Sequence, residues 1–202
     1  MSKGLMLIIS GPAGSGKGTV NAHLIGSGDF VYSVSATTRM PRPGEVDGVN
    51  YHFITKEDFI SRIENGDMLE YTEYCGNFYG TPKKEAIAVL ESGKNLILEI
   101  EVDGANQIKE KYPDAVLIML LPPSFKTQEQ RLRGRGTESE DKVLARLERT
   151  REELADVSSY DYIVYNYDGK DTEAADRIRA IVDAEKSSIR RNPNVRDRYF
   201  ED

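Results

Sequence analysis

Residues 5–19, with the sequence LMLIISGPAGSGKGT, constrain the fold of this chain more than any other segment. The first five are apolar and predict a buried strand. Gly11 and Gly16 follow in the spacing G-x-x-x-x-G-K, and residues without a Cβ let successive backbone N–H groups turn inward around phosphate oxygens. A ligand-free glycine turn is the alternative, but the helical pattern behind the loop favours phosphate binding. One face of that helix carries Val20, Leu24 and Ile25.

The end of this loop departs from the usual pattern at the residue that normally binds magnesium. Lys17 supplies a cation for the phosphates, but Gly18 stands where a Ser or Thr hydroxyl usually binds magnesium, and Thr19 comes one residue late. We therefore expect Mg²⁺ to be bound mainly through the phosphates of the bound nucleotide and water, and assign it no direct protein ligand. The loop residues expected to bind this nucleotide, which the family resemblance given below implies to be ATP, are Gly11, Pro12, Ala13, Gly14, Ser15, Gly16, Lys17, Gly18 and Thr19.

Composition and charge exclude several classes of protein. A chain of 202 residues with 39% apolar content can bury one substantial core with a small lobe or two. The net charge of −7 argues against a nucleic-acid-binding protein, which normally carries a basic face. The single cysteine, Cys75, is expected to be a small packing residue. No apolar run near the N-terminus suits a signal peptide or a membrane span, so we expect a soluble cytoplasmic protein whose partners include neither nucleic acid nor membrane.

Apolar runs alternate with helical patterns along the chain, which predicts an α/β protein with a parallel sheet covered by helices. Residues 82–92 are expected to form a helix with Thr81 as its N-cap, and residues 173–190 a second long helix. The tail, residues 194–202, is expected to be frayed. The runs that predict core strands are residues 5–9, 96–100, 116–121 and 162–165.

Two stretches interrupt this alternation and are expected to be insertions above the sheet. In residues 34–81, the pattern predicts a helix at 56–65 and short strands at 51–54, 68–74 and 77–79. Residues 126–153 are rich in arginine, and Thr137 with Glu140 suggests a capping box. The expected core comprises the remaining residues, 1–33, 82–125 and 154–202.

Cationic side chains occur in both insertions. Arg39 and Arg42 lie in a stretch that prolines keep stiff and non-helical, which suits bidentate contacts with phosphate; two solvated surface arginines are the alternative. In the second insertion, a helical face follows an apolar stripe of Val143, Leu144, Leu147 and Leu154. That face carries Lys142, Arg146 and Arg149, and a solvated surface is its simplest interpretation.

Segments 33–48, 76–81, 131–138 and 160–166, together with Tyr51, resemble those of guanylate kinases of the bacterial type in order and spacing. The resemblance extends from residue 5 to about residue 184. It implies the P-loop nucleoside monophosphate kinase fold, in which a parallel sheet core flanked by helices carries an inserted GMP-binding lobe and a lid. Here these would be residues 34–81 and 126–153.

The resemblance also implies a role for individual residues of the lobe. Ser35, Glu70 and Thr81 match residues that read the guanine edge, and a carboxylate such as Glu70 can accept hydrogen bonds from guanine N1–H and N2–H together. Taken alone, Glu70 could equally lie on the solvent-exposed face of an amphipathic strand. Glu101 stands where an aspartate is often found beside guanine. The residues that match the GMP phosphate site are Arg39, Arg42, Tyr51 and Tyr79.

On the donor side, the resemblance implies that Arg131, Arg135 and Arg146 bind phosphates when the lid closes, with Gly134 and Gly136 giving backbone freedom. Asn166 matches a residue near the donor adenine. Glu99 and Glu101, or Thr19, could reach magnesium through ordered water. The residues expected to be catalytic are Lys17, Arg39, Arg135 and Arg146.

The implied reaction is ATP:GMP phosphotransfer in purine nucleotide metabolism, with dGMP as a second acceptor. One alternative is a catalytically inactive guanylate-kinase-like module that binds phosphopeptides, although such modules generally lack an intact phosphate loop. Another is a related P-loop kinase with a different small acceptor. The sequence does not predict an oligomeric state.

Overall fold

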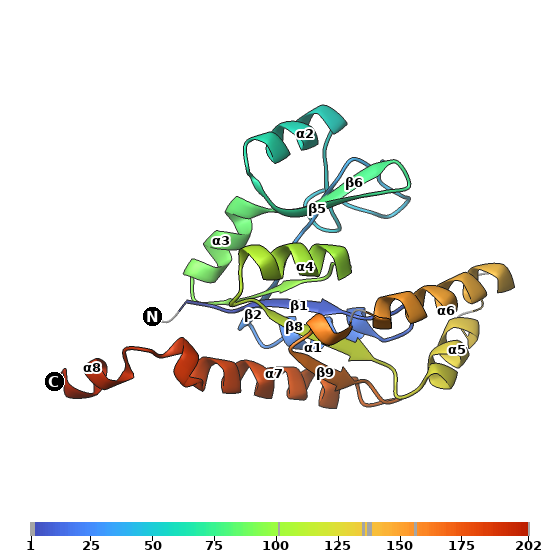
Figure 1. The fold of residues 1–202 in the computed structure, drawn as a ribbon. Coiled ribbons are helices and arrows are strands. Elements are labelled where there is room, and N and C mark those ends of the chain that lie inside the picture. The colour runs from blue at the N-terminus through green and yellow to red at the C-terminus, as the bar shows by residue number, and fades with distance from the viewer. Residues whose placement is uncertain (1–2, 101, 135, 137–138, 156, 202) are drawn as a thin grey trace.

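A parallel sheet forms the centre of the molecule, which a computed structural model describes over residues 3–100, 102–134, 136, 139–155 and 157–201 (Figure 1). The spatial order of its strands is β2-β7-β1-β8-β9. All of its strand pairs are parallel. The strands are β1 (Met6–Ser10), β2 (Phe30–Tyr32), β7 (Asn95–Leu98), β8 (Val116–Leu121) and β9 (Tyr162–Tyr165).

The expected core strands are therefore confirmed, with two differences. Strand β7 ends at Leu98, so Glu99 lies just beyond the strand. Strand β2 was not expected, because three residues are too short to show a pattern. Its place at the edge of the sheet is fixed by pairing with β7, where Phe30 lies opposite Asn95.

Helices cover both faces of this sheet, as Figure 1 shows. Because successive strand residues point to opposite faces, Leu7 and Ile9 pack towards α1 and α7 while Ile8 packs towards α3 and α4. No helix in the described part of the chain is long and apolar enough to cross a membrane. The helices are α1 (Lys17–Ile25), α3 (Lys83–Glu91), α4 (Val102–Lys111) and α7 (Asp171–Ser187).

Two of these helices differ from the sequence expectation in detail. In α1, Val20 and Leu24 are buried, but Ile25 is 40% exposed and the polar Asn21 is buried instead. Helix α3 begins after Pro82, and Thr81 does not cap it, because the Thr81 hydroxyl donates to a carboxylate within the lobe. The prediction of Thr81 as N-cap was therefore wrong.

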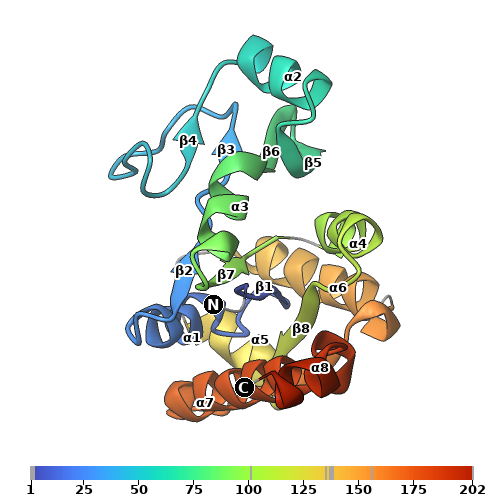
Figure 2. The same cartoon turned by 90° about the vertical axis from the view of Figure 1, so that its left-hand side faces the viewer.

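A second sheet, in the order β4-β3-β6-β5, forms a lobe above the main sheet together with α2 (Figure 2). Phe59 of α2 is fully buried and stacks on Phe78. Cys75 lies in the turn between β5 and β6 and is exposed, so the expectation that it packs in the interior was wrong. The elements are β3 (Ala36–Thr37), β4 (His52–Phe53), α2 (Lys56–Glu64), β5 (Met68–Tyr74) and β6 (Asn77–Pro82).

Two helices follow β8 in the chain: α5 (Phe125–Gly134) and α6 (Glu140–Ala155). Val143 and Leu147 of α6 are buried against Leu132 of α5, whereas Leu144 is 51% exposed. Thr137 lies outside the described residues, so the capping box stays a prediction. A short 3₁₀ turn, η1 (Val157–Ser159), leads into β9.

The C-terminal segment is helical rather than frayed. After α7 it forms a 3₁₀ turn, η2 (Ile189–Arg191), and α8 (Val195–Phe200), which extends away from the body in Figure 1. Arg191 of η2 is largely buried, and its Nε donates to Glu185 at 2.7 Å while its Nη2 donates to the carbonyl of Asp114. The 3₁₀ turn η2 is therefore held against α7 and the segment before β8, while α8 beyond it is exposed.

Candidate functional site

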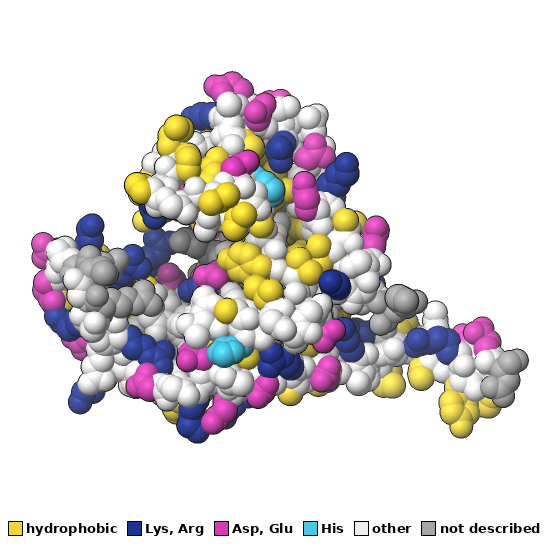
Figure 3. Space-filling model, turned by 180° about the vertical axis from the view of Figure 1, so that it is seen from behind, with side chains coloured by type: hydrophobic (Ala, Val, Ile, Leu, Met, Phe, Trp, Pro, Cys, Tyr) yellow, Lys and Arg dark blue, Asp and Glu magenta, His cyan; other side chains and the backbone are white. Residues whose placement is uncertain are grey.

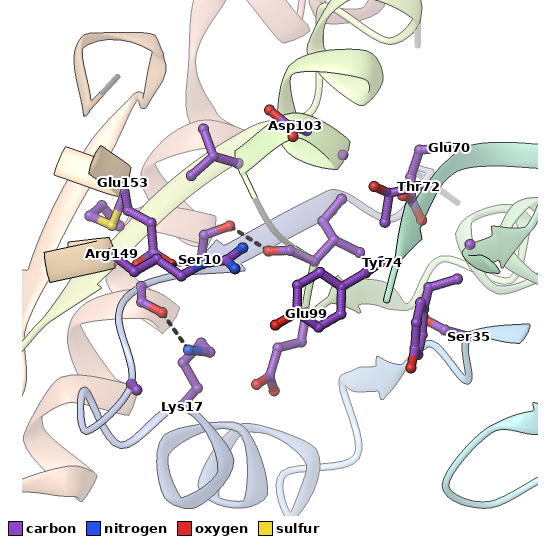
Figure 4. A pocket seen from close by; sticks show the side chains of 18 of the residues that line it. Ser10, Lys17, Ser35, Glu70, Thr72, Tyr74, Glu99, Asp103, Arg149 and Glu153 are labelled. Atoms are coloured by element: carbon purple, nitrogen blue, oxygen red, sulfur yellow. Dashed lines mark hydrogen bonds and ion pairs between the residues drawn. The ribbon is translucent and has the colours of Figure 1, made fainter. Parts of the chain in front are cut away.

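A cavity of about 550 Å³ opens where the carboxyl end of β1 meets the lobe and α6. The molecule is hollowed between the upper lobe and the body beneath it (Figure 3). Open parallel α/β sheets bind ligands at this end of their strands. The cavity wall combines loop residues, lobe residues, the segment after β7 and one side of α6 (Figure 4).

The loop predicted from the sequence lies at the floor of this cavity. Gly14 and Gly16 have φ values of 85° and 88°, in the left-handed region that glycine adopts without steric cost. Helix α1 begins at Lys17, so its first backbone N–H groups have no partner within the helix. The Lys17 ammonium donates to the carbonyl of Gly11, which holds the cation over the loop.

We expect Gly16→Ala to weaken ATP binding about tenfold or more, because the left-handed conformation costs an L-residue about 1–2 kcal/mol. The added Cβ would also lie 2.4 Å from Nδ2 of Asn166. Calorimetric titration with ATP would measure the loss. Gly26→Ala is the matched control, because Gly26 has φ −59° and its nearest added contact is 3.5 Å away. Equal ATP affinity in the two variants would contradict the prediction.

Asn166 and Arg131 lie behind the loop rather than on the cavity wall. The Asn166 amide donates to the carbonyl of Ser15 at 3.0 Å and to Asp171. The Arg131 guanidinium donates to the carbonyl of Gly14 at 3.0 Å and pairs with Asp168. Both side chains therefore brace the loop backbone, and their contacts with adenine and phosphate stay predictions.

Glu70 is a buried carboxylate in the lobe, with 2% of its surface exposed. A register shift between Met68 and Tyr71 forms a bulge in β5, so that Leu69 and Glu70 are both buried although they are consecutive. Glu70 Oε1 accepts a hydrogen bond of 2.7 Å from the hydroxyl of Thr81 on β6. The interpretation of Glu70 as a solvated strand residue is therefore wrong.

Burial raises the pKa of the Glu70 carboxyl, and the hydrogen bond from Thr81 and the charge of Lys111 oppose this rise. A carboxylate held in this way gains from any ligand that donates hydrogen bonds to it. Gly104, in the first turn of α4, allows the close approach: a Cβ there would lie 2.7 Å from Glu70 Oε2. The bulge and this glycine together set the position of the carboxylate.

The Arg39 guanidinium is held by Glu45, through bonds of 2.9 Å from Nη1 to Oε2 and from Nη2 to Oε1. It also lies 5.5 Å from the centre of the Tyr51 ring. Tyr51 and Tyr79 line the cavity with their rings edge-on, 6.1 Å apart. Arg39 thus stands behind the cavity's aromatic wall. The Arg42 side chain is exposed, while its backbone N–H donates to Glu45.

Glu99, just after β7, extends into the cavity from the sheet side (Figure 4). Its Oε2 accepts a 3.0 Å hydrogen bond from Asn21 Nδ2 and a 3.3 Å bond from the Tyr32 hydroxyl. Burial, with the neighbouring Glu99, raises the pKa of that tyrosine. Asn21 and Tyr32 were not expected from the sequence. A polar residue on the buried face of a helix, as Asn21 is, was the available signal.

Helix α6 supplies Arg146, Arg149 and Glu153 to the cavity wall. The expected phosphate ligand Arg146 therefore faces the cavity, and Arg149 joins it. The lobe residue Ser35 also lines the cavity, as expected. Glu101 and Arg135 lie outside the described residues, so their assigned contacts stay predictions.

These features define an α/β protein of the P-loop nucleotide-binding class with a second lobe beside the loop. The guanylate kinase family model matches residues 3–185 of the chain. The chain is 49% identical to a guanylate kinase of Streptococcus thermophilus, over 94% of this chain and 90% of that protein. It is 47% identical to one of Clostridioides difficile, over 96% and 95%.

The fold is also similar to the crystal structure of guanylate kinase from Anaplasma phagocytophilum. The TM-score is 0.73 and the sequence identity 34%, over 93% of this chain and 89% of that one. The chain belongs to the guanylate kinase family. Both the expected fold and the expected family are confirmed.

Proposed function

We propose that the chain transfers the γ-phosphoryl group of ATP to GMP or dGMP, giving ADP and GDP or dGDP, in purine nucleotide metabolism. The observation that carries this proposal is one cavity walled by both Lys17 of the phosphate loop and the buried Glu70 of the lobe. The loop side suits a nucleoside triphosphate. The lobe side offers a buried carboxylate, Glu70, that can accept hydrogen bonds from guanine.

Phosphoryl transfer leaves the protein mainly the tasks of alignment and charge neutralisation. The attacking oxygen of GMP is already ionised at neutral pH, so no general base is required. Lys17 at the loop and Arg146 on α6 face the same cavity and can spread the charge of the group in transit. The division of the chain into core, lobe at 34–81 and lid at 126–153 belongs to this proposal.

The lobe would recognise the acceptor nucleotide, GMP, through its base and hold it through its phosphate. Guanine presents N1–H and N2–H side by side, and Glu70 can accept both, while adenine would not supply these two hydrogen bonds to the buried carboxylate, at a cost of about 1–3 kcal/mol. Ser35 and Thr81 would bind the same edge. The GMP phosphate would contact Tyr51, Tyr79, Arg39 and Arg42, with Glu45 keeping the Arg39 guanidinium in position.

Magnesium fits this site as a companion of the nucleotide phosphates. Within the described residues, no three His, Cys, Asp or Glu side chains converge as a metal-binding group. Mg²⁺ commonly keeps several waters and binds through one or two carboxylates plus substrate phosphates. Glu99, fixed by Asn21 and Tyr32, would hold such an ion through water. When bound, the ion would neutralise phosphate charge.

A hydroxyl at position 18 should strengthen the use of magnesium, because a Cβ at Gly18 meets no atom within 4 Å and a serine therefore fits. We expect Gly18→Ser to lower the Mg²⁺ concentration needed for half-maximal activity severalfold. Gly18→Ala, which adds the Cβ without the oxygen, is the control. Identical metal titrations for the two variants would contradict the expectation.

The proposed function is tested by a coupled assay with ATP and each nucleoside monophosphate in turn. We expect turnover with GMP and dGMP, and far less with AMP, UMP or CMP. Preference for another acceptor would favour a different P-loop kinase. Failure to bind ATP in a calorimetric titration would favour the phosphopeptide-binding module, against which the intact loop from Gly11 to Lys17 argues. The expected cytoplasmic location also remains part of the proposal.

The KM for GMP should depend on the ionisation of Glu70. Because burial raises the folded-state pKa of this carboxyl above its ordinary value, the free enzyme gives up the proton late as pH rises. The protonated form cannot accept both guanine N–H bonds, so KM should fall as pH rises through that window. The raised pKa also gives Glu70 a contribution to the free energy of unfolding that is fully present below the ordinary glutamate pKa and is lost as pH rises through the pKa of the folded state. Initial rates with GMP varied, from about pH 5 to pH 8, would measure the change in KM.

Glu70→Gln is the companion variant for this pH profile. Its amide keeps the shape of the side chain but does not titrate. We expect a KM for GMP that is raised and independent of pH in this range. A profile that is unchanged in this variant would assign the titration to another group.

A further inference from the structure

Arg149 and Tyr74 form a contact that joins the two sides of the cavity. Arg149 lies on α6 and Tyr74 at the end of β5 in the lobe, and both line the cavity wall. The Arg149 guanidinium carbon lies 5.6 Å from the centre of the Tyr74 ring. A guanidinium within about 6 Å of a ring centre is in the range of cation–π attraction.

Tyr74 is positioned by strand pairing at the end of a tight hairpin. Tyr74 pairs with Asn77 across a two-residue turn. The turn residues, Cys75 and Gly76, have φ values of 50° and 74°. Two positive φ angles are typical of the tight turns that match the twist of their strands. The tip of the lobe is therefore a tight turn that continues the pairing of β5 with β6.

The guanidinium is fixed from its own side as well. Arg149 Nε donates to Glu153 Oε1 at 3.3 Å, one helical turn later on α6. This contact and the ring aim the flat guanidinium at the lobe. The neighbouring Arg146 occupies the same wall, so one residue of this cationic face is positioned for phosphate and the other for the lobe.

We propose that Arg149 and Tyr74 act as positioning residues that clasp the lid segment to the GMP lobe while both nucleotides are enclosed. This inference rests on the proposed function. Neither side chain takes part in the transfer itself. The clasp stabilises the closed arrangement, in which water is excluded and the two phosphates are aligned.

The first test is a double-mutant cycle on kcat and on the KM for GMP. We expect Tyr74→Leu to raise the KM for GMP about twofold to fivefold with a smaller change in kcat, because the variant loses one exposed cation–π contact. Tyr74→Phe keeps the ring and should restore the KM. Tyr74→Leu added to Arg149→Gln should cause no further loss, since the partner is already gone. Additive losses would overturn the proposal.

The second test measures the distance between lobe and lid without reference to activity. Cys75 is the only cysteine of the chain and is exposed beside Tyr74, so one added cysteine gives a defined pair of spin labels. Ala145→Cys, at an exposed position on α6, supplies the second label. We expect a narrow distance distribution that Tyr74→Leu and Arg149→Gln broaden and Tyr74→Phe preserves. A distribution that none of them changes would overturn the clasp.

Arg151→Gln is the matched control for both tests. Arg151 is on the same helix but pairs with Glu148 and lies over the Phe125 ring, away from the cavity. Its KM and distance distribution should remain those of the parent protein. Absence of GMP phosphorylation by the parent protein would refute the proposed function, whereas the distance measurement tests the clasp in either case.

Discussion

Replacing Lys17 with methionine should reduce kcat by about 10²–10³-fold, the usual effect of removing one fixed charge that stabilises a transition state. The Lys17 ammonium is held over the loop through the Gly11 carbonyl and faces the cavity where the phosphates would lie. Methionine keeps an unbranched side chain of similar length but removes the cation. Rates at saturating ATP and GMP would measure the effect.

The fold should survive this change, because the apolar core of the sheet does not include Lys17. The melting temperature should therefore stay close to that of the parent protein. Lys84→Met removes one positive charge at an exposed position on α3 that does not line the cavity, and it should leave kcat unchanged. If the two lysine variants retained equal activity, the assignment of Lys17 would be wrong.

Arg39→Ala should reduce kcat/KM for GMP by about 10²-fold or more while ATP affinity stays unchanged. The fork of this arginine is matched in the free protein by the Glu45 carboxylate, with two bonds of 2.9 Å. A phosphate can make the same bidentate contact. The alanine variant loses that contact, and the remaining surface arginine, Arg42, cannot replace it. Kinetics with GMP varied and calorimetry with ATP would separate the two effects.

Glu45→Gln is the variant that tests whether the carboxylate positions Arg39. The hydrogen bond from Arg39 lowers the pKa of Glu45 to about 2. Its contribution to stability is therefore present above the ordinary glutamate pKa and is lost only as pH falls towards about 2. The ion pair persists at every pH used for assays. We expect an intermediate loss of kcat/KM in Glu45→Gln; a loss in Arg39→Ala no larger than this would contradict a direct phosphate contact.

The sequence alone was sufficient for elements whose pattern is local and long. The strand before the loop, the loop and the range of β5 were all predicted, since each has a sequence pattern that extends over several residues. The strands β2 and β3 have no such pattern, because two or three residues do not establish a period. Their places are set by pairing with distant strands.

Two of the errors have a common physical origin in tertiary contacts. Thr81 was assigned to cap α3, but a buried carboxylate eleven residues earlier in the chain is the stronger partner for its hydroxyl. Ile25 was placed on the buried face of α1, where Asn21 lies instead because it can donate to Glu99. In both cases a polar group from another part of the chain determined the contact.

What the sequence determined by itself was the chemistry of the phosphate loop and the family, because the glycine spacing and the order of the motifs are properties of neighbouring residues. Only the tertiary structure decided that Glu70 is buried and that Arg149 reaches Tyr74. Burial and cross-cavity contacts depend on which distant elements pack together. The bulge in β5 is the clearest case, since strict alternation would have placed Leu69 and Glu70 on opposite faces.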